Sequence, residues 1–122
     1  AKGPAGSVFD RPSALERLGG DEQLFRELAA YFLEDSEELL KRIEAAAATG
    51  DWPAVRIDAH SLKGLAANFS ARPATEAARE LEHASAEGAA DRAAPLIGRL
   101  RSEVERLREN LVEFAKTARE NP

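Results

Sequence analysis

The chain has 122 residues, of which 17 are basic and 22 acidic, so we expect one small domain with a net charge of −5. Its 25 alanines against only ten β-branched residues favour an all-α fold. The absence of cysteine excludes disulfides, thiolate metal sites and a cysteine nucleophile, and the acidic balance argues against a general nucleic-acid binder. No apolar run approaches the roughly 20 residues that cross a bilayer, and no signal-peptide pattern opens the chain, so we expect a cytoplasmic domain.

The start of the chain differs in composition from the rest. Residues 1–7 are rich in Gly, Pro and Ser and have no periodicity, which is typical of a linker or a remnant of cloning. We therefore expect the domain to span residues 8–120. Its first element is a short helix that is capped by Asp10 or Arg11 and ends at the glycine pair 19–20.

The pattern then predicts a long amphipathic helix. Asp21 is a suitable N-cap, and Thr49 with Gly50 provides the stop signal. Apolar residues recur at steps of three and four, as on one face of a helix, with Ser36 as the polar interruption. The residues of this stripe are Phe25, Leu28, Phe32, Leu39, Ile43 and Ala47.

A second helix with an unbroken apolar stripe begins after Asp51, which is its expected N-cap. The stripe consists of Trp52, Val55, Ala59, Leu62, Ala66 and Phe69, and we expect Trp52 and Phe69 to lie in the core. Residues 70–73 form a short connection, because Pro73 favours the start of a helix and disfavours helical geometry at Arg72.

Two further helices complete the fold. The first runs to Gly88 and presents a narrow face of small residues with one leucine, at Ala74, Ala77, Ala78, Leu81 and Ala84. The last has a strict apolar series at Ile97, Leu100, Val104, Leu107, Leu111, Phe114 and Ala118. Asp91 could cap this helix, but Pro95 fits better if the helix begins at Ala94 or Pro95. The sequence thus predicts an up-and-down antiparallel four-helix bundle with a short extra N-terminal helix.

The outer face of the helix after Asp51 has an unusual composition. At 100° per residue, His60 lies about 130° and Gly64 about 170° from the centre of the apolar stripe, with Ala67 near the side of His60. A glycine inside a helix costs roughly 1 kcal/mol relative to alanine, so Gly64 suggests close approach by another molecule. Ile57 lies on this same face and is a candidate for a docking patch, although single exposed apolar residues are common.

Two cations flank His60 in a chain that is acidic overall. Arg56 and Lys63 are its helical neighbours at i−4 and i+3. They would stabilise an anion at the ring, and the flexible ammonium of Lys63 suits a phosphoryl group. Either residue could also be an ordinary solvated charge.

Glu82 is the candidate partner of the imidazole. If the connection is centred near Ala71, then His60 and Glu82 lie at matching heights in an antiparallel helix hairpin. A carboxylate that accepts the Nδ1 hydrogen would leave the lone pair on Nε2 directed outward, as a nucleophilic histidine needs. The alternative is that Glu82 pairs with Arg79 on its own helix. We expect His83, the other histidine, to be an ordinary solvated residue. Two histidines on different faces do not predict a zinc site.

The sequence around His60 resembles the signature of histidine-containing phosphotransfer (HPt) domains. The resemblance rests on His-x-Leu-Lys-Gly at residues 60–64 and on an acidic residue at the position of Glu82. It extends to Leu-Gly-Gly-Asp at residues 18–21 and Gly-Asp-Trp at residues 50–52. Ser70 departs from the family, which usually has glycine at this helix end.

This resemblance implies a phosphorelay carrier rather than an enzyme. His60 would accept a phosphoryl group from an aspartyl phosphate on one receiver domain and pass it to another, with Lys63 and Glu82 at the matching family positions. The divalent cation would belong to the receiver, so we expect no cofactor or metal on this domain. We further expect a monomer that contacts neither nucleic acid nor membrane. The domain would belong to a hybrid sensor histidine kinase or stand free; the alternative function is a helical adaptor that is not phosphorylated.

Overall fold

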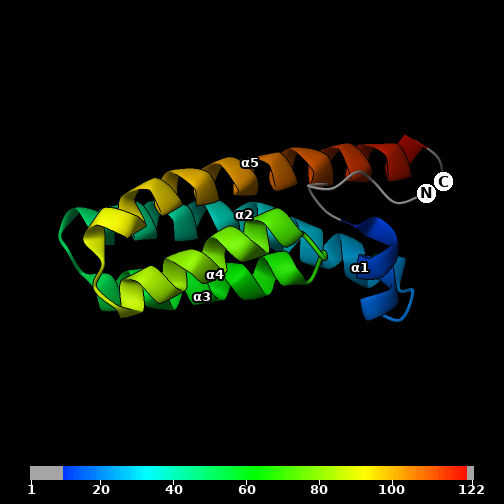
Figure 1. The fold of residues 1–122 in the computed structure, drawn as a ribbon. Helices are drawn as coiled ribbons and strands as arrows, with labels where there is room; N and C mark the ends of the chain where they lie inside the picture. The colour runs from blue at the N-terminus through cyan, green and yellow to red at the C-terminus, as the bar shows by residue number, and fades with distance from the viewer. Residues whose placement is uncertain (1–9, 121–122) are drawn as a thin grey trace.

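The structure, a computed structural model, describes the backbone of residues 10–120 and the side chains of residues 10–114. Five helices cover this range (Figure 1). They are α1 (Arg11–Arg17), α2 (Glu22–Ala48), α3 (Trp52–Ala67), α4 (Arg72–Ala86) and α5 (Ala90–Glu120). The predicted linker at residues 1–7 and the predicted start of the domain at residue 8 lie outside the described residues.

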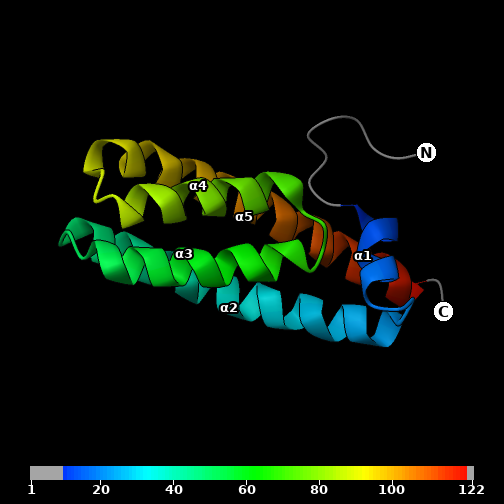
Figure 2. The same cartoon turned by 60° about the horizontal axis from the view of Figure 1, so that its bottom comes forward.

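The four long helices form a ring in which each helix packs against two others. α2 contacts α3 and α5, and α4 contacts the same two helices from the other side. Figure 2 shows α1 packed at the end of the bundle where α2 begins. Short connections make consecutive helices antiparallel, so the predicted all-α, up-and-down four-helix bundle with an extra N-terminal helix is confirmed.

Helix starts follow the predicted capping residues. The side chains of Asp10, Asp21 and Asp51 each accept a hydrogen bond from the backbone N–H three residues later, at 3.0–3.2 Å. At the other end of α2, Gly50 has a φ of +75°, in the left-handed region that glycine occupies without strain. These local signals fix where α1, α2 and α3 begin.

Two boundaries predicted from proline are wrong. α4 begins at Arg72, because Pro73 occupies the first turn, where a helix does not use the missing N–H. α5 begins at Ala90, and Pro95 lies inside it. Pro95 removes one hydrogen bond near the helix start, and burial of Ala93 favours the additional turn.

Phenylalanine rings and alanines fill the core. Phe69 makes edge contacts with Phe25 and Phe32, at centroid distances of 5.5 and 5.7 Å. The small predicted face of α4 is buried throughout, which allows α4 to pack closely between its neighbours. Trp52 packs against the core, as predicted, but it is only partly buried.

Ser36, the polar residue within the apolar stripe of α2, is fully buried. Its hydroxyl accepts a hydrogen bond of 2.8 Å from Arg108 on α5, and the same guanidinium donates to the Leu33 carbonyl. The buried hydroxyl is therefore paired, which removes most of the cost of desolvating it. Over residues 10–120, no helix has the length and apolarity of a membrane-spanning segment.

Candidate functional site

His60 lies in the middle of α3 with its side chain 65% exposed. Val55, Ala59 and Leu62 on the same helix are buried and fix α3 against the bundle. The helix therefore orients the face that carries His60 outward, as the periodicity of the stripe predicts.

Glu82 of α4 holds the imidazole. Its Oε2 lies 2.9 Å from His60 Nδ1, which confirms the predicted contact between the two helices. Glu82 follows the fully buried Leu81 and is itself only 15% exposed at its side chain, so its carboxylate is fixed at the edge of the core. Because a carboxylate accepts, this contact places the hydrogen of a neutral ring on Nδ1 and its lone pair on Nε2.

Lys63 binds the other oxygen of the same carboxylate. Its Nζ lies 2.8 Å from Glu82 Oε1. The Lys63 ammonium contributes most to holding the pKa of the Glu82 carboxyl below its ordinary value; burial opposes this effect, and the His60 ring adds to it. Glu82 is therefore ionised at neutral pH.

The alternative pairing of Glu82 with Arg79 is wrong. Arg79 forms an ion pair with Glu76 on its own helix, with 2.6 Å between Nη2 and Oε1. The sequence did not predict the contact between Lys63 and Glu82, because it assigned Lys63 either to a phosphoryl group or to solvent. Since Lys63 is one turn from His60, and His60 was already matched in height with Glu82, the spacing contained a signal for this contact.

The remaining predicted site residues also lie on α3, and they differ in exposure. Arg56 and Ile57 are exposed, Ile57 to 64%. Gly64 is also exposed, and a Cβ at this position would have no atom within 4 Å. The packing of this domain therefore does not require glycine there. Ala67 is half-buried and lines an open hollow of about 500 Å³ between α1 and the start of α4.

Comparison with known proteins assigns the chain to a family. The family model for the Hpt domain matches residues 27–110. The chain belongs to the Hpt domain family. Hpt domains carry phosphoryl groups on histidine and interact with receiver domains, so this chain is a histidine phosphotransfer domain of a two-component phosphorelay, a phosphocarrier.

Solved structures agree with the family. The chain is 28% identical to histidine-containing phosphotransfer protein B (HptB) from Pseudomonas aeruginosa PAO1, with a TM-score of 0.84 over 93% of this chain and 98% of that chain. It is 18% identical to the HPT domain of an Hpt sensor hybrid histidine kinase from Shewanella, with a TM-score of 0.78 over 90% and 95% of the two chains. The second likeness supports the fold alone. A search of curated proteins finds no significant match.

The departure of Ser70 from the usual glycine of Hpt domains is visible in its backbone. Ser70 has a φ of +52°, in the left-handed region that costs a side-chain-bearing residue about 1–2 kcal/mol. Its hydroxyl accepts a hydrogen bond of 3.1 Å from Arg17 Nε of α1. The substitution thus links the turn between α3 and α4 to α1.

The sequence also failed to identify Asp58 as a residue that supports the Hpt site. Asp58 is 5% exposed, and its carboxylate binds Arg42 Nη2 of α2 at 2.9 Å. It lies two residues before His60, so this ion pair fixes α3 against α2 directly behind the site. No local motif indicates a pair that is separated by 16 positions on two helices.

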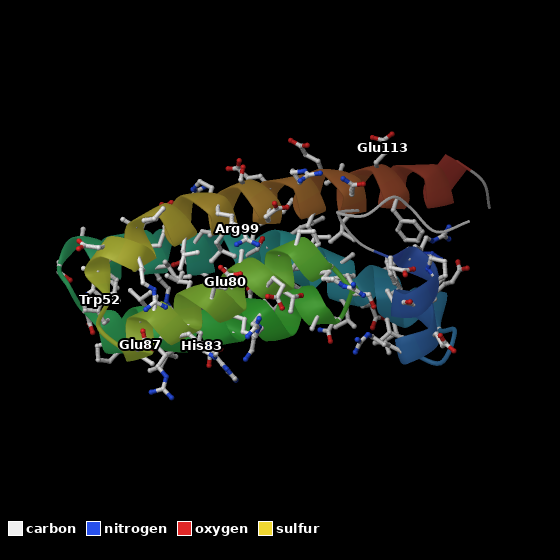
Figure 3. The ribbon with its side chains drawn as sticks, in the orientation of Figure 1. Trp52, Glu80, His83, Glu87, Arg99 and Glu113 are labelled. Carbon is white, nitrogen blue, oxygen red and sulfur yellow. The ribbon has the colours of Figure 1, made fainter. Side chains whose placement is uncertain are left out.

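The second histidine of the Hpt domain has ordinary surroundings. His83 is exposed on α4 and lies near Glu87 (Figure 3). Glu87 forms an ion pair with Arg92. The neighbouring Glu80 binds Arg99 of α5 at 3.1 Å. Among the residues that the structure describes, no three His, Asp or Glu side chains converge on a possible metal position.

Proposed function

We propose that His60 is the phosphoacceptor of this Hpt domain, that its donor is an aspartyl phosphate on a receiver domain, and that a second receiver takes the phosphoryl group from it. The observation that carries this proposal is the hydrogen bond of 2.9 Å between His60 Nδ1 and Glu82 on an imidazole that is 65% exposed. This contact orients the ring and leaves the lone pair of Nε2 available as the nucleophile.

The transfer is an in-line displacement at phosphorus. The Nε2 lone pair forms a bond to phosphorus, while the bond between phosphorus and the aspartyl oxygen breaks and its electron pair returns to the aspartate. Nδ1 keeps its hydrogen, so the phosphorylated ring carries a positive charge. The Glu82 carboxylate stabilises this charge. The same step in reverse delivers the group to the second receiver.

The residues around His60 have separate roles in this proposal. Arg56 and Lys63 supply positive charge near the phosphoryl group. Ile57, Gly64 and Ala67 contribute to a docking surface for the receiver, where the absence of a side chain at Gly64 permits close approach.

The chemistry of transfer is divided between the two partners. The receiver supplies the divalent cation that stabilises the transferring group, and this domain holds neither metal nor cofactor of its own. The domain therefore acts as a carrier and not as an enzyme. We place it in the cytoplasm as a monomer without nucleic-acid or membrane contacts, either as part of a hybrid sensor histidine kinase or as a free-standing protein.

The test is incubation of the domain with a receiver that carries a labelled aspartyl phosphate. We expect alkali-stable, acid-labile label on the wild-type domain and on His83→Gln, and no label on His60→Gln. His83 is the matched control because it is the other histidine and is also exposed.

Two results would contradict the proposal. Undiminished label on His60→Gln would place the acceptor elsewhere. Stable binding of the receiver with no label on the wild type would favour the non-phosphorylated adaptor.

A further inference from the structure

One carboxylate group connects the imidazole of His60 with the ammonium of Lys63. Glu82 binds His60 Nδ1 through Oε2 at 2.9 Å and Lys63 Nζ through Oε1 at 2.8 Å. The ammonium of Lys63 is thus already engaged in the unphosphorylated domain. A phosphoryl group on His60 has to compete with Glu82 for it.

Phosphorylation changes which anion attracts the Lys63 ammonium more strongly. Before transfer, the neutral ring of His60, the Lys63 cation and the Glu82 anion sum to zero charge. A protein-bound phosphoryl group carries about −1.5 to −2 charges near pH 7, and the ring beneath it becomes positive. The phosphoryl oxygens then attract the ammonium more strongly than one carboxylate does. The carboxylate meanwhile gains a charged N–H donor at Nδ1.

We propose that Lys63 is a switching residue: Glu82 holds it before transfer, and it moves to the phosphoryl oxygens on His60 after transfer, which leaves Glu82 paired with the imidazolium alone. This inference rests on His60 being the phosphoacceptor. It assigns to Lys63 a different partner in each state of the carrier, while Glu82 keeps its contact with His60 in both.

The two side chains differ in their freedom to move. Glu82 is 15% exposed and follows the fully buried Leu81, so its position is fixed by the core. Lys63 is 29% exposed and lies one turn from His60 on the same helix. A flexible chain of about four carbons joins its ammonium to the backbone. The exchange therefore requires movement of the lysine side chain only.

The exchange can be observed by nuclear magnetic resonance of the lysine ammonium nitrogens. The domain is phosphorylated with phosphoramidate, which loses ammonia as the phosphoryl group passes to histidine, and ³¹P spectra confirm the phosphohistidine. The Nζ signal of Lys63 is then compared between wild type and Glu82→Gln in both states. Lys41, which is exposed on α2, is the internal reference.

We expect Glu82→Gln to shift the Lys63 signal in the unphosphorylated domain and to leave it unchanged in the phosphorylated domain. The reciprocal variant, Lys63→Met, is read at the Glu82 carboxyl carbon and should show the same pattern, so the test does not depend on one variant. Shifts of equal size in both states would mean that Lys63 stays on Glu82 and would overturn the inference. The absence of any shift in the unphosphorylated domain would overturn it as well.

These outcomes are distinct from failure of the proposed function. If no phosphohistidine forms on the wild type, or if it forms on His60→Gln, then the assignment of His60 fails and the exchange fails with it. If phosphohistidine forms on His60 but the Lys63 signal depends on Glu82 in both states, then only the exchange is wrong.

Discussion

Substitution of Gly64 by alanine separates the stability of the domain from its docking to a partner. An alanine in place of a helical glycine raises the free energy of unfolding by about 0.5–1 kcal/mol, because glycine loses more backbone entropy on folding. This gain is available at Gly64, since the added Cβ would have no atom within 4 Å. For a domain of this size we expect the melting temperature to rise by about 2–4 °C.

The same methyl group should slow phosphotransfer. If the receiver approaches α3 directly over Gly64, an added methyl separates the reacting atoms by roughly 1 Å, and misplacement on this scale costs up to about 100-fold in rate. We expect Gly64→Ala to reduce the second-order rate constant of transfer by about 10-fold to 100-fold. Gly64→Gln should reduce it further while the helix content stays unchanged.

Gly98 of α5 provides a matched control for this experiment. It is also exposed inside a helix, and a Cβ there would likewise have no atom within 4 Å. Gly98→Ala should give the same gain in melting temperature without slowing transfer, because α5 lies across the bundle from α3. Transfer at the wild-type rate by both Gly64 variants, or equal slowing by Gly98→Ala, would refute the steric argument.

Three further predictions concern the stability of the fold. The pKa of the Glu82 carboxyl is lowered by Lys63 and His60, so its contribution to stability is present above the ordinary glutamate pKa of about 4.3 and is lost as the pH falls through the lowered folded value. In urea unfolding, Glu82→Gln should therefore be less stable than wild type at pH 7 and indistinguishable from it at the acid end. A loss of stability that is independent of pH would contradict this. Phe69→Ala should lose about 3–5 kcal/mol, because it removes the ring that contacts Phe25 and Phe32, and a loss below about 1 kcal/mol would mean that the three rings do not form the centre of the core. Ser70→Gly should raise the free energy of unfolding by about 0.5–1 kcal/mol, because relief of the positive φ outweighs the exposed hydrogen bond from Arg17; a drop in the urea midpoint would show the reverse.

The success of sequence reasoning at this site has a geometrical cause. His60 and Glu82 are paired by the symmetry of a hairpin about its short connection, so counting positions was sufficient to predict their contact. Lys63 lies one turn from His60, so the same counting also places it near Glu82, but its ammonium was predicted to contact only a phosphoryl group or solvent. The ion pair of Asp58 with Arg42 joins α3 to α2, and no local sequence motif indicates which residues of these helices meet, so it was not predicted.

The wrong boundaries have a common cause. The predictions at Arg72 and Pro95 applied local rules for proline, which concern only the backbone near the ring. In the fold, α5 starts before Pro95 because the additional turn buries Ala93 completely. Tertiary packing therefore overrides a local preference when the local cost is one hydrogen bond.

His60 and Glu82, whose carboxylate orients the ring, are only 22 positions apart in the chain and lie on two consecutive helices. Contacts between segments this close in sequence have a small loop-closure cost and re-form quickly after local opening. A transient loosening of α1 or of the far end of α5 would therefore leave the His60 ring aligned with Glu82. The α3–α4 hairpin thus contains both partners of this contact, and the rest of the bundle stabilises the hairpin.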